Sequence, residues 1–439
     1  MTLLLSNLAP DVIFSVLVFC DISSVIAASQ TCRYLHDLAF DKSVWLGLLD
    51  NLRHRSILDR TIELGTLSVA EMVKIVRRLI TGPKTWSPLN IWVPSAEVFR
   101  EITVHLRSEP GLGSSLTYKA QLLPSGHYVL FAAGSILECW NVAEDRLVWK
   151  YTSAIDSKSE LVWVVDFAAQ ETDIESVIIM VCARTFPNQK AWVEIVNLNL
   201  RTGTRDVLLL ARAPDFALSV PFLQPVILGA LATVKMYIDT YMIIDWTAHL
   251  YMILRAPSDN TSQIALIPQH ILLMTRSPSL TGQQIHLISI DALHALWTPT
   301  SSVDGPLKFS LISAEDIPKL STFEHTDDGH SVHKMYVHDS PLQDGEYRVW
   351  IRGGTGYATE PTLSSYRLSI PTHGHPQWYQ RNRLAVSGAS DHAISYCGHA
   401  LSSTLIREFS RQTEFFDLTQ YSGALIRFTR STIVIRYYK

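Results

Sequence analysis

Histidines and acidic residues gather between positions 325 and 339, and imidazole and carboxylate groups are common ligands of transition metals. A strand over 331–339 would place His333 and His338 on opposite faces, and His330 would lie about 26 Å from His338. Metal ligands lie at about 2 Å from the ion, so we predict no metal site here. The residues concerned are His325, Asp327, Asp328, His330, His333, His338 and Asp339.

No other short motif predicts catalysis or a cofactor. The glycines at 111–113 and 353–356 have no predicted helix after them that could aim backbone amides at a phosphate, so we interpret them as turns. The sequence has no nucleophile elbow, no HExxH pair and no P-loop. We therefore predict a protein that is not an enzyme. A hydrolase stays open as an alternative, because catalytic groups meet in space and need not be neighbours in sequence.

Composition predicts a multidomain globular protein whose partners are not polyanions. The chain has 439 residues, of which 47% are hydrophobic and 18% are charged, with a net charge of −4 and no long run of like charge. Such a chain can bury more than one core, and we expect no nucleic-acid partner. The five cysteines stand singly, which favours a reducing compartment, so we expect the protein in the cytoplasm, the nucleus or both.

The apolar N-terminal region predicts helices and not a signal peptide or a membrane span. The uncharged run from Val12 to Cys20 is nine residues long, lies between Asp11 and Asp21, and has no basic residue before it. A span needs about 20 apolar residues and a signal peptide needs a basic start, so we expect no membrane association. Capping signals predict helices over 10–19, 22–29 and 31–40, and a fourth from about Ser43.

A fifth helix is predicted after a polar stretch. Ser68 and Glu71 have the spacing of a capping box, and apolar residues continue at helical spacing as far as Ile80. Gly82 and Pro83 end the pattern. We interpret 51–88 as a helical linker that acts as a semi-rigid spacer.

The first predicted helix is apolar around most of its circumference. Ile13, Val16, Leu17 and Cys20 form one stripe, and other apolar side chains cover most of the remaining surface. Three or four short helices cannot enclose such a helix, so part of its surface should meet another protein or another domain. The alternative is a helical cap that packs only against the rest of this chain.

The same segment resembles an F-box. The residues that carry the resemblance are Leu8 to Ile13, Val16-Leu17, Thr31-Cys32-Arg33 and Leu38 to Trp45. Ala9 stands where the family usually has its first proline, and Leu35 stands where an aromatic residue is common. The resemblance implies a helical hook that binds a Skp-type adaptor and, through it, a cullin scaffold. The residues that it implies for this contact are Leu8, Pro10, Val12, Ile13, Val16, Leu17, Ile22, Val25, Cys32 and Leu35.

From about Leu89 onward, short alternating apolar runs separated by Gly, Pro, Asn and Asp predict an all-β domain. The segment from Gly126-His127 to Trp140-Asn141 resembles a WD-repeat blade, and looser copies follow at spacings near 45 to 50 residues. We expect a β-propeller with seven blades, or six as the alternative. The last copy lacks an outer strand, so we predict that a strand near 102–106 returns to pair with 433–437.

The basic residues of the C-terminal quarter offer one substrate contact. Arg348 and Arg352 fall in a predicted strand, and a guanidinium group can bind phosphate through two hydrogen bonds. In some F-box propellers, rim arginines bind phosphorylated substrates, so the resemblance implies a protein substrate with or without phosphate. Ordinary surface arginines are the alternative.

The sequence therefore predicts an α+β multidomain protein. We assign 1–50 to an F-box-like helical module, 51–88 to the linker and 89–439 to a WD-repeat-like propeller. The resemblance implies the substrate receptor of an SCF-type ubiquitin ligase, a non-catalytic subunit in ubiquitin-dependent protein degradation. A propeller scaffold for protein–protein interaction without a ligase role is the alternative.

Overall fold

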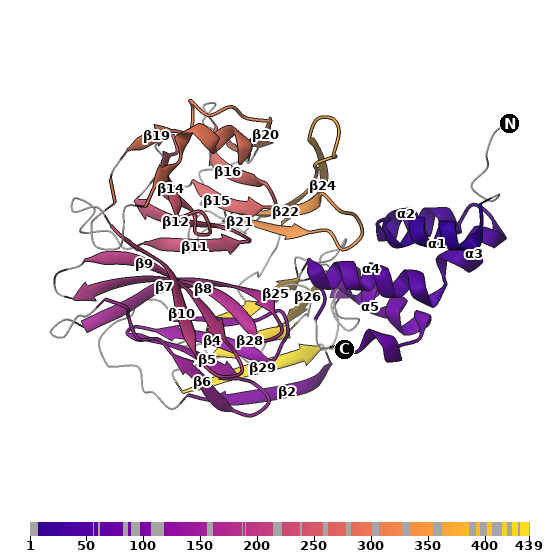
Figure 1. Cartoon of the computed structure of the whole chain (residues 1–439), viewed down its shortest axis with the longest axis horizontal. Coiled ribbons are helices and arrows are strands. Elements are labelled where there is room, and N and C mark those ends of the chain that lie inside the picture. Colours follow the sequence, from indigo (N-terminus) through magenta and orange to yellow (C-terminus); the bar gives the residue numbers. More distant parts are fainter. Residues whose placement is uncertain are drawn as a thin grey trace.

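The chain forms a helical module at one end and a large all-β region beside it (Figure 1). This computed structural model describes residues 8–55, 57–59, 62–81, 87–88, 97–106, 118–155, 161–186, 188, 190–213, 222–237, 239–257, 262–277, 282–300, 307–308, 310–326, 334–353, 362–385, 392–395, 402–405, 415–418, 424–428 and 431–438. The expected change from helical to β structure along the chain is confirmed.

Local capping signals set the boundaries of the helices. Asp21 accepts a hydrogen bond from the Ser24 amide at 2.6 Å and caps the second helix. Ser68 and Glu71 form the expected capping box, in which the Ser68 amide donates to the Glu71 carboxylate at 2.8 Å. The helices are α1 (Pro10–Val18), α2 (Ile22–Ser29), α3 (Arg33–Ala39), α4 (Lys42–His54) and α5 (Val69–Thr81), with a 3-10 turn η2 (Leu64–Thr66).

One hydrophobic core joins all five helices. Ile13 of α1, Trp45 of α4 and Met72 of α5 are fully buried in it. Gly47 allows α4 to pack closely against α1, because a Cβ atom at position 47 would lie 2.6 Å from a methyl group of Val18. α5 packs into the core of the helical module, whereas the sequence suggests a semi-rigid spacer over 51–88. The amphipathic pattern of this helix predicts a buried face, but it does not say which partner covers that face.

The β region consists of antiparallel sheets that follow one another along the chain. In the described residues there are seven sheets, and each contains strands that are close in sequence. The first has β3 (Tyr118–Leu122), β4 (Tyr128–Ala133), β5 (Ile136–Asn141) and β6 (Arg146–Lys150); the second has β7 (Leu161–Asp173), β8 (Ser176–Phe186), β9 (Ala191–Asn199) and β10 (Arg205–Arg212); the third has β11 (Leu223–Leu228), β12 (Leu231–Tyr237), β13 (Thr240–Asp245) and β14 (Leu250–Arg255).

The remaining sheets include two strands from before the first sheet. The fourth sheet has β15 (Gln263–Ile267), β16 (His270–Arg276), β17 (Gly282–Ser289) and β20 (Ser321–Thr326); the fifth has β21 (Lys334–Asp339), β22 (Glu346–Gly353), β23 (Thr362–Ser369) and β24 (Gln377–Ala385); the sixth has β25 (His392–Ser395), β26 (Ser402–Leu405) and β1 (Ser87–Pro88); the seventh has β27 (Phe415–Leu418), β28 (Ala424–Phe428), β29 (Thr432–Tyr438) and β2 (Val98–His105).

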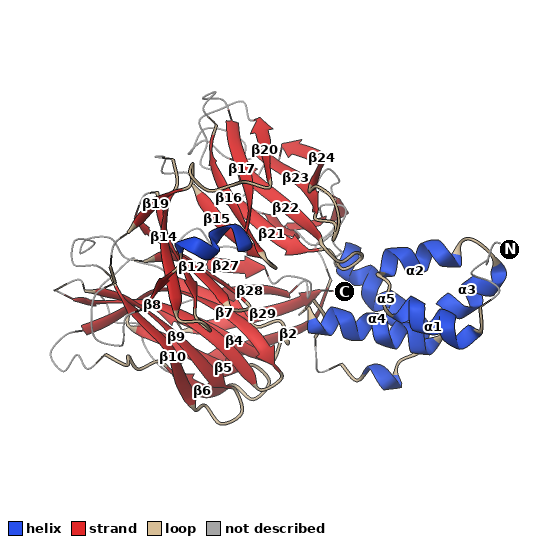
Figure 2. Ribbon diagram, turned by 45° about the horizontal axis from the view of Figure 1, so that its top comes forward, coloured by secondary structure: helices blue, strands red, loops and turns tan. Residues whose placement is uncertain are grey.

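Hydrophobic cores lie between consecutive sheets. Separate clusters of buried side chains join the first sheet to the second, the second to the third, the third to the fourth, the fourth to the fifth, and the seventh to the first. Edge strands of consecutive sheets contact one another at several places, as β7 contacts β11, β11 contacts β15 and β27 contacts β3. Sheets packed face to face in this cyclic order are consistent with a β-propeller (Figure 2).

The last sheet takes its outer strand from the beginning of the β region. β2 pairs antiparallel with β29, with Ile102 opposite Ile435 and Val104 opposite Ile433. This register agrees with the expectation that 102–106 returns to pair with 433–437. Val104 is fully buried in the cluster that joins the seventh sheet to the first, so β2 covers an edge and also completes a core.

The segment between β17 and β20 departs from a simple four-strand repeat. It forms a 3-10 helix η4 (Asp291–Leu296) and then two short strands, β18 (Thr298–Pro299) and β19 (Leu311–Ser313). β18 pairs antiparallel with β14, and β19 pairs parallel with the same strand. These strands cover the outer edge of the third sheet, a feature that the spacing of the repeats did not predict.

Polar contacts fix the helical module to the β region at several points. Arg55, after α4, donates to the Ser340 carbonyl at 2.8 Å and pairs with Asp344 in the β21–β22 turn. The Ser23 amide of α2 donates to the Leu342 carbonyl of the same turn at 3.0 Å. On α5, Arg78 donates to the Tyr438 carbonyl at 2.8 Å. The contacts come from three helices, so the module is held against rotation.

Candidate docking surface on the helical module

An uncovered apolar stripe runs along α1. Val12 and Val16 are 47% and 44% exposed, and Phe19, directly after the helix, is 92% exposed. Their spacing of four and then three residues places them on one face of the helix. Exposed apolar side chains in a row are unusual on a monomer and are typical of a surface that meets a partner.

The adjacent face of α1 belongs to the core of the module. Ile13 and Leu17 are buried in that core, and the partly buried Val18 lies against Gly47 of α4. The helix is therefore divided lengthwise between an inner stripe that holds the fold together and an outer stripe that remains accessible. The sequence alone does not divide them, because both stripes are apolar.

The ten residues that the F-box resemblance implies for adaptor contact fall into two groups. The buried group cannot touch a partner without rearrangement, and substitutions in it would test folding before docking. It contains Ile13, Leu17, Ile22, Val25 and Leu35. The accessible group contains Pro10, Val12, Val16 and Cys32, which are exposed, and Leu8, which is partly buried.

Phe19 is the docking candidate that the sequence reasoning missed. It lies seven residues after Val12 and is more exposed than any other large hydrophobic side chain in the described part of the chain. Its i+7 spacing from Val12 was the signal that could have identified it.

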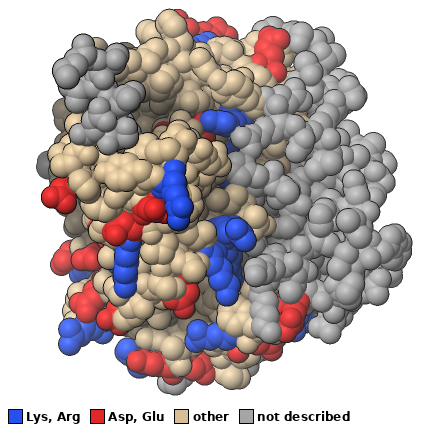
Figure 3. Space-filling view, turned by 90° about the vertical axis from the view of Figure 1, so that its right-hand side faces the viewer, with Lys and Arg blue, Asp and Glu red and all other residues tan. Residues whose placement is uncertain are grey.

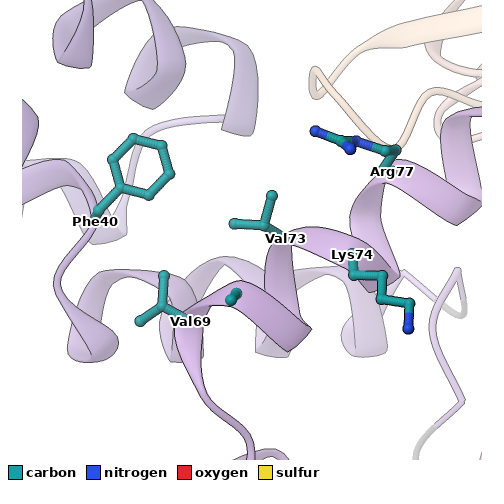
Figure 4. A pocket seen from close by; sticks show the side chains of 6 residues that line it. Phe40, Val69, Val73, Lys74 and Arg77 are labelled. Carbon is teal, nitrogen blue, oxygen red and sulfur yellow. The ribbon is translucent and has the colours of Figure 1, made fainter.

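A hollow of about 390 Å³ lies beside the helices (Figure 4). Val69 and Val73 project from α5 on the side of Phe40, and Lys74 and Arg77 extend at the other side. A second, wider groove of about 930 Å³ lies between α4, the turn η2 and Ile174 in the β7–β8 turn. The surface of the helical module thus has these two hollows as well as the exposed stripe on α1.

Charge does not define the helical end of the molecule. Figure 3 shows acidic and basic side chains interspersed on this end, with wide uncharged areas between them. A mixed surface of this kind is ordinary for a soluble domain and does not predict a polyanionic partner.

Of the two arginines considered for phosphate binding, the structure describes the side chain of Arg348. Arg348 is only 8% exposed and lies in β22 opposite His338 of β21. The side chains from 346 to 351 are buried on both faces of this strand, so Arg348 lies inside the packed β region. The backbone of Arg352 belongs to β22, while its side chain lies outside the described residues.

The two described histidines between 325 and 339, His325 and His338, make different local contacts. His325 lies beside the Tyr366 hydroxyl of the next sheet, and His338 lies opposite Arg348. Asp327, Asp328, His330 and His333 lie outside the described residues. Within the described ranges, no three His, Cys, Asp or Glu side chains are grouped so that they could hold a metal ion.

Two buried imidazoles make the β region sensitive to acid. Burial lowers the pKa of His286 to about 4, and Lys319 adds to this. Burial lowers the pKa of His338 to about 4 as well, with Arg348 as the second cause. Both ring nitrogens of His286 lie 3.1 Å from threonine hydroxyls, those of Thr275 and Thr322. The fold therefore holds these rings neutral.

We expect the free energy of unfolding to fall as the pH drops from about 6.5 to about 4. In that window the unfolded chain binds protons at these histidines and the folded chain does not, which costs at most roughly 3 kcal/mol per histidine. Urea denaturation at a series of pH values measures the effect. The variant His286→Gln with His338→Gln should show a flatter dependence than the wild type, and equal slopes would contradict the assignment.

None of the helices in the described ranges is both long and apolar enough to cross a membrane.

Comparisons with known proteins find similarity only among solved structures. No family model matches the sequence, and no curated protein matches it. The WD40 domain of SCAP from fission yeast matches with 9% identity over 73% of this chain and 82% of that chain, at a TM-score of 0.28. Hsv2 from Kluyveromyces lactis matches with 10% identity over 61% of this chain and 86% of that chain, at a TM-score of 0.32. Drosophila Semaphorin 1a, extracellular domains 1-2, matches with 9% identity over 78% of this chain and 88% of that chain, at a TM-score of 0.35.

Proposed function

We propose that the chain is a substrate-recognition subunit of an SCF-type ubiquitin ligase. The helical module would bind a Skp-type adaptor, and a seven-bladed β-propeller would hold a protein substrate. The observation that carries the proposal is the uncovered stripe of Val12, Val16 and Phe19. It lies on the segment that resembles an F-box, and no described residue of the chain covers it.

The chemistry of such a subunit is proximity. A target bound to the β region and a conjugating enzyme held through the adaptor and cullin would share one assembly, which raises the effective concentration of a target lysine. No catalytic group of this chain is needed. The contacts of Arg55, Ser23 and Arg78 support this role, because they hold the two parts at a constant orientation.

Capture of a Skp-type adaptor tests the proposal. We expect the full chain to bind the purified adaptor, and Val16→Asp with Phe19→Asp to weaken binding at least tenfold, because charged groups would replace apolar contacts in a desolvated interface. Both side chains are exposed, so the thermal unfolding of the variant should match that of the wild type. Isothermal titration of each protein with the adaptor measures the difference.

A matched control keeps the adaptor test specific. Val207→Asp changes an equally accessible valine, 44% exposed, on the distant strand β10 and should leave adaptor binding intact. If the wild type fails to bind the adaptor, or the stripe variant binds as well as the control, the adaptor role is wrong. Adaptor binding without cullin recruitment would favour the alternative, an interaction scaffold outside ubiquitin transfer.

A further inference from the structure

A partly exposed cluster with two aromatic rings lies at the end of the β7–β8 hairpin, which has the longest strands in the described part of the β region. It comprises Leu161 and Trp163 at the start of β7 and Arg184 and Phe186 at the end of β8. The register places Leu161 opposite Phe186 and Trp163 opposite Arg184. Because side chains alternate along a strand, all four project from the same face of the sheet. We call this set the hairpin-end cluster.

The cluster is exposed because neighbouring sheets differ in length. The same face of β8 continues into Cys182 and Met180, which are buried in the core between the second and third sheets. β7 and β8 have 13 and 11 residues, whereas β11 and β12 of the third sheet have 6 and 7. The β7–β8 hairpin extends beyond the third sheet, which packs against it, and Leu161 and Phe186 are 54% and 52% exposed.

The geometry of the cluster is ordered. The rings of Trp163 and Phe186 stack with their centroids 5.6 Å apart and their planes at 9°. The Arg184 guanidinium lies over the ring of Trp163, 5.5 Å from its centroid. Stacking fixes the rings in advance, so a ligand would lose little side-chain entropy when it binds them.

The positive charge of Arg184 indicates that the cluster would bind an acidic ligand. Arg184 makes no ion pair with any described residue, and Lys190 is exposed in the turn that follows β8. The carboxylates that the structure describes in the same half of the sheet have partners. Glu194 is fully buried and accepts hydrogen bonds from Tyr151 and Arg205, and Asp166 accepts one from Lys119. A stacked guanidinium is well suited to an external carboxylate.

The cluster also lies far from the helical module. The opposite end of the hairpin carries Ile174, which lines the groove beside α4. At 3.3 Å per residue, β7 separates Leu161 from that turn by roughly 40 Å. A partner seated on the cluster would therefore not compete with a protein bound to α1.

We infer that the hairpin-end cluster is a binding site for an acidic peptide segment of a partner protein, with a bulky apolar side chain seated on Leu161 and Phe186 and a neighbouring carboxylate on Arg184. The inference rests on the proposed function only in naming that partner a ligase substrate. Peptide binding itself needs neither the adaptor nor the cullin.

Selection from a random dodecapeptide display library tests the site with the full chain as bait. We expect the wild type to enrich peptides in which a Leu, Phe or Trp adjoins Asp or Glu. Phe186→Ser should abolish the apolar preference and Arg184→Glu the acidic one. Val207→Ser, an exposed valine on the same sheet, is the matched control and should select the wild-type set. Thermal unfolding of each variant confirms that the sheet is intact.

A titration with one selected peptide separates the two halves of the contact. We expect Phe186→Ser to weaken binding at least tenfold in fluorescence anisotropy. Arg184→Glu should weaken it by a similar factor, and replacing the peptide glutamates by glutamine should remove most of that difference. Enrichment of basic or uncharged peptides, no enrichment, or the same set from every variant would overturn the site.

The two proposals fail separately. Loss of peptide selection with adaptor capture intact would leave the proposed function without this site. Peptide selection without adaptor capture would retain the site on a protein that is not a ligase subunit.

Discussion

Val104→Asp is expected to open the β region and to lower the free energy of unfolding by at least about 3 kcal/mol, because it places a carboxylate in a dry core without a partner. Val104 is fully buried between the seventh and first sheets, opposite Ile433 on β29. Without β2, the edge of β29 would be free to pair with other chains. Thermal unfolding and the onset of aggregation measure both consequences.

A second substitution on the same strand controls this experiment. Val98→Asp makes the same chemical change at the other end of β2, where the side chain is 37% exposed, and should cost less than about 1 kcal/mol. Equal stability of the two variants would show that β2 does not complete the last sheet.

Trp45→Ala is expected to unfold the helical module as one unit, with a loss of about 3–5 kcal/mol. Trp45 is almost fully buried, stacks on Phe40 at 5.8 Å, and donates its indole N–H to the Ala39 carbonyl at 3.0 Å. Because α5 shares this core, amide hydrogen exchange should speed up in α1 to α5 together while β7 to β10 stay protected.

Tyr34→Ala is the control for the tryptophan, since Tyr34 is an aromatic residue of the same module that is 39% exposed. Its effect should stay below about 1 kcal/mol. If α5 kept its protection in the Trp45 variant, it would be independent of this core, as the semi-rigid spacer predicted over 51–88 would be.

Local signals made the helices predictable. The expected bounds of α2 match those observed, and α1, α3 and α5 differ from their predictions by one or two residues at the ends. Asp21 and the Ser68–Glu71 box act within one turn, so their effect does not depend on the rest of the fold. The pairs of β-strands followed for a similar reason, since alternation and turn residues are local too.

Burial on a specific face was not predictable from such signals. Val12 and Ile13 are adjacent aliphatic residues, and only the position of α4, brought close by Gly47, decides that Ile13 is buried and Val12 exposed. Arg348 shows the converse case, because an arginine in a strand suggests an open surface while the packing of β22 encloses it. The hairpin-end cluster depends on a difference in strand length between two neighbouring sheets, and no signal within a single strand reports that difference.

Under the proposed function, the contacts of Arg55, Ser23 and Arg78 across the junction would also affect the choice of substrate. A receptor with a hinge would move a bound substrate through a wide volume, whereas one held at three points would leave that movement to the substrate itself. The flexible length between the bound segment and a modifiable lysine of the target would then set the reach, so selection among targets could depend on spacing as well as on affinity.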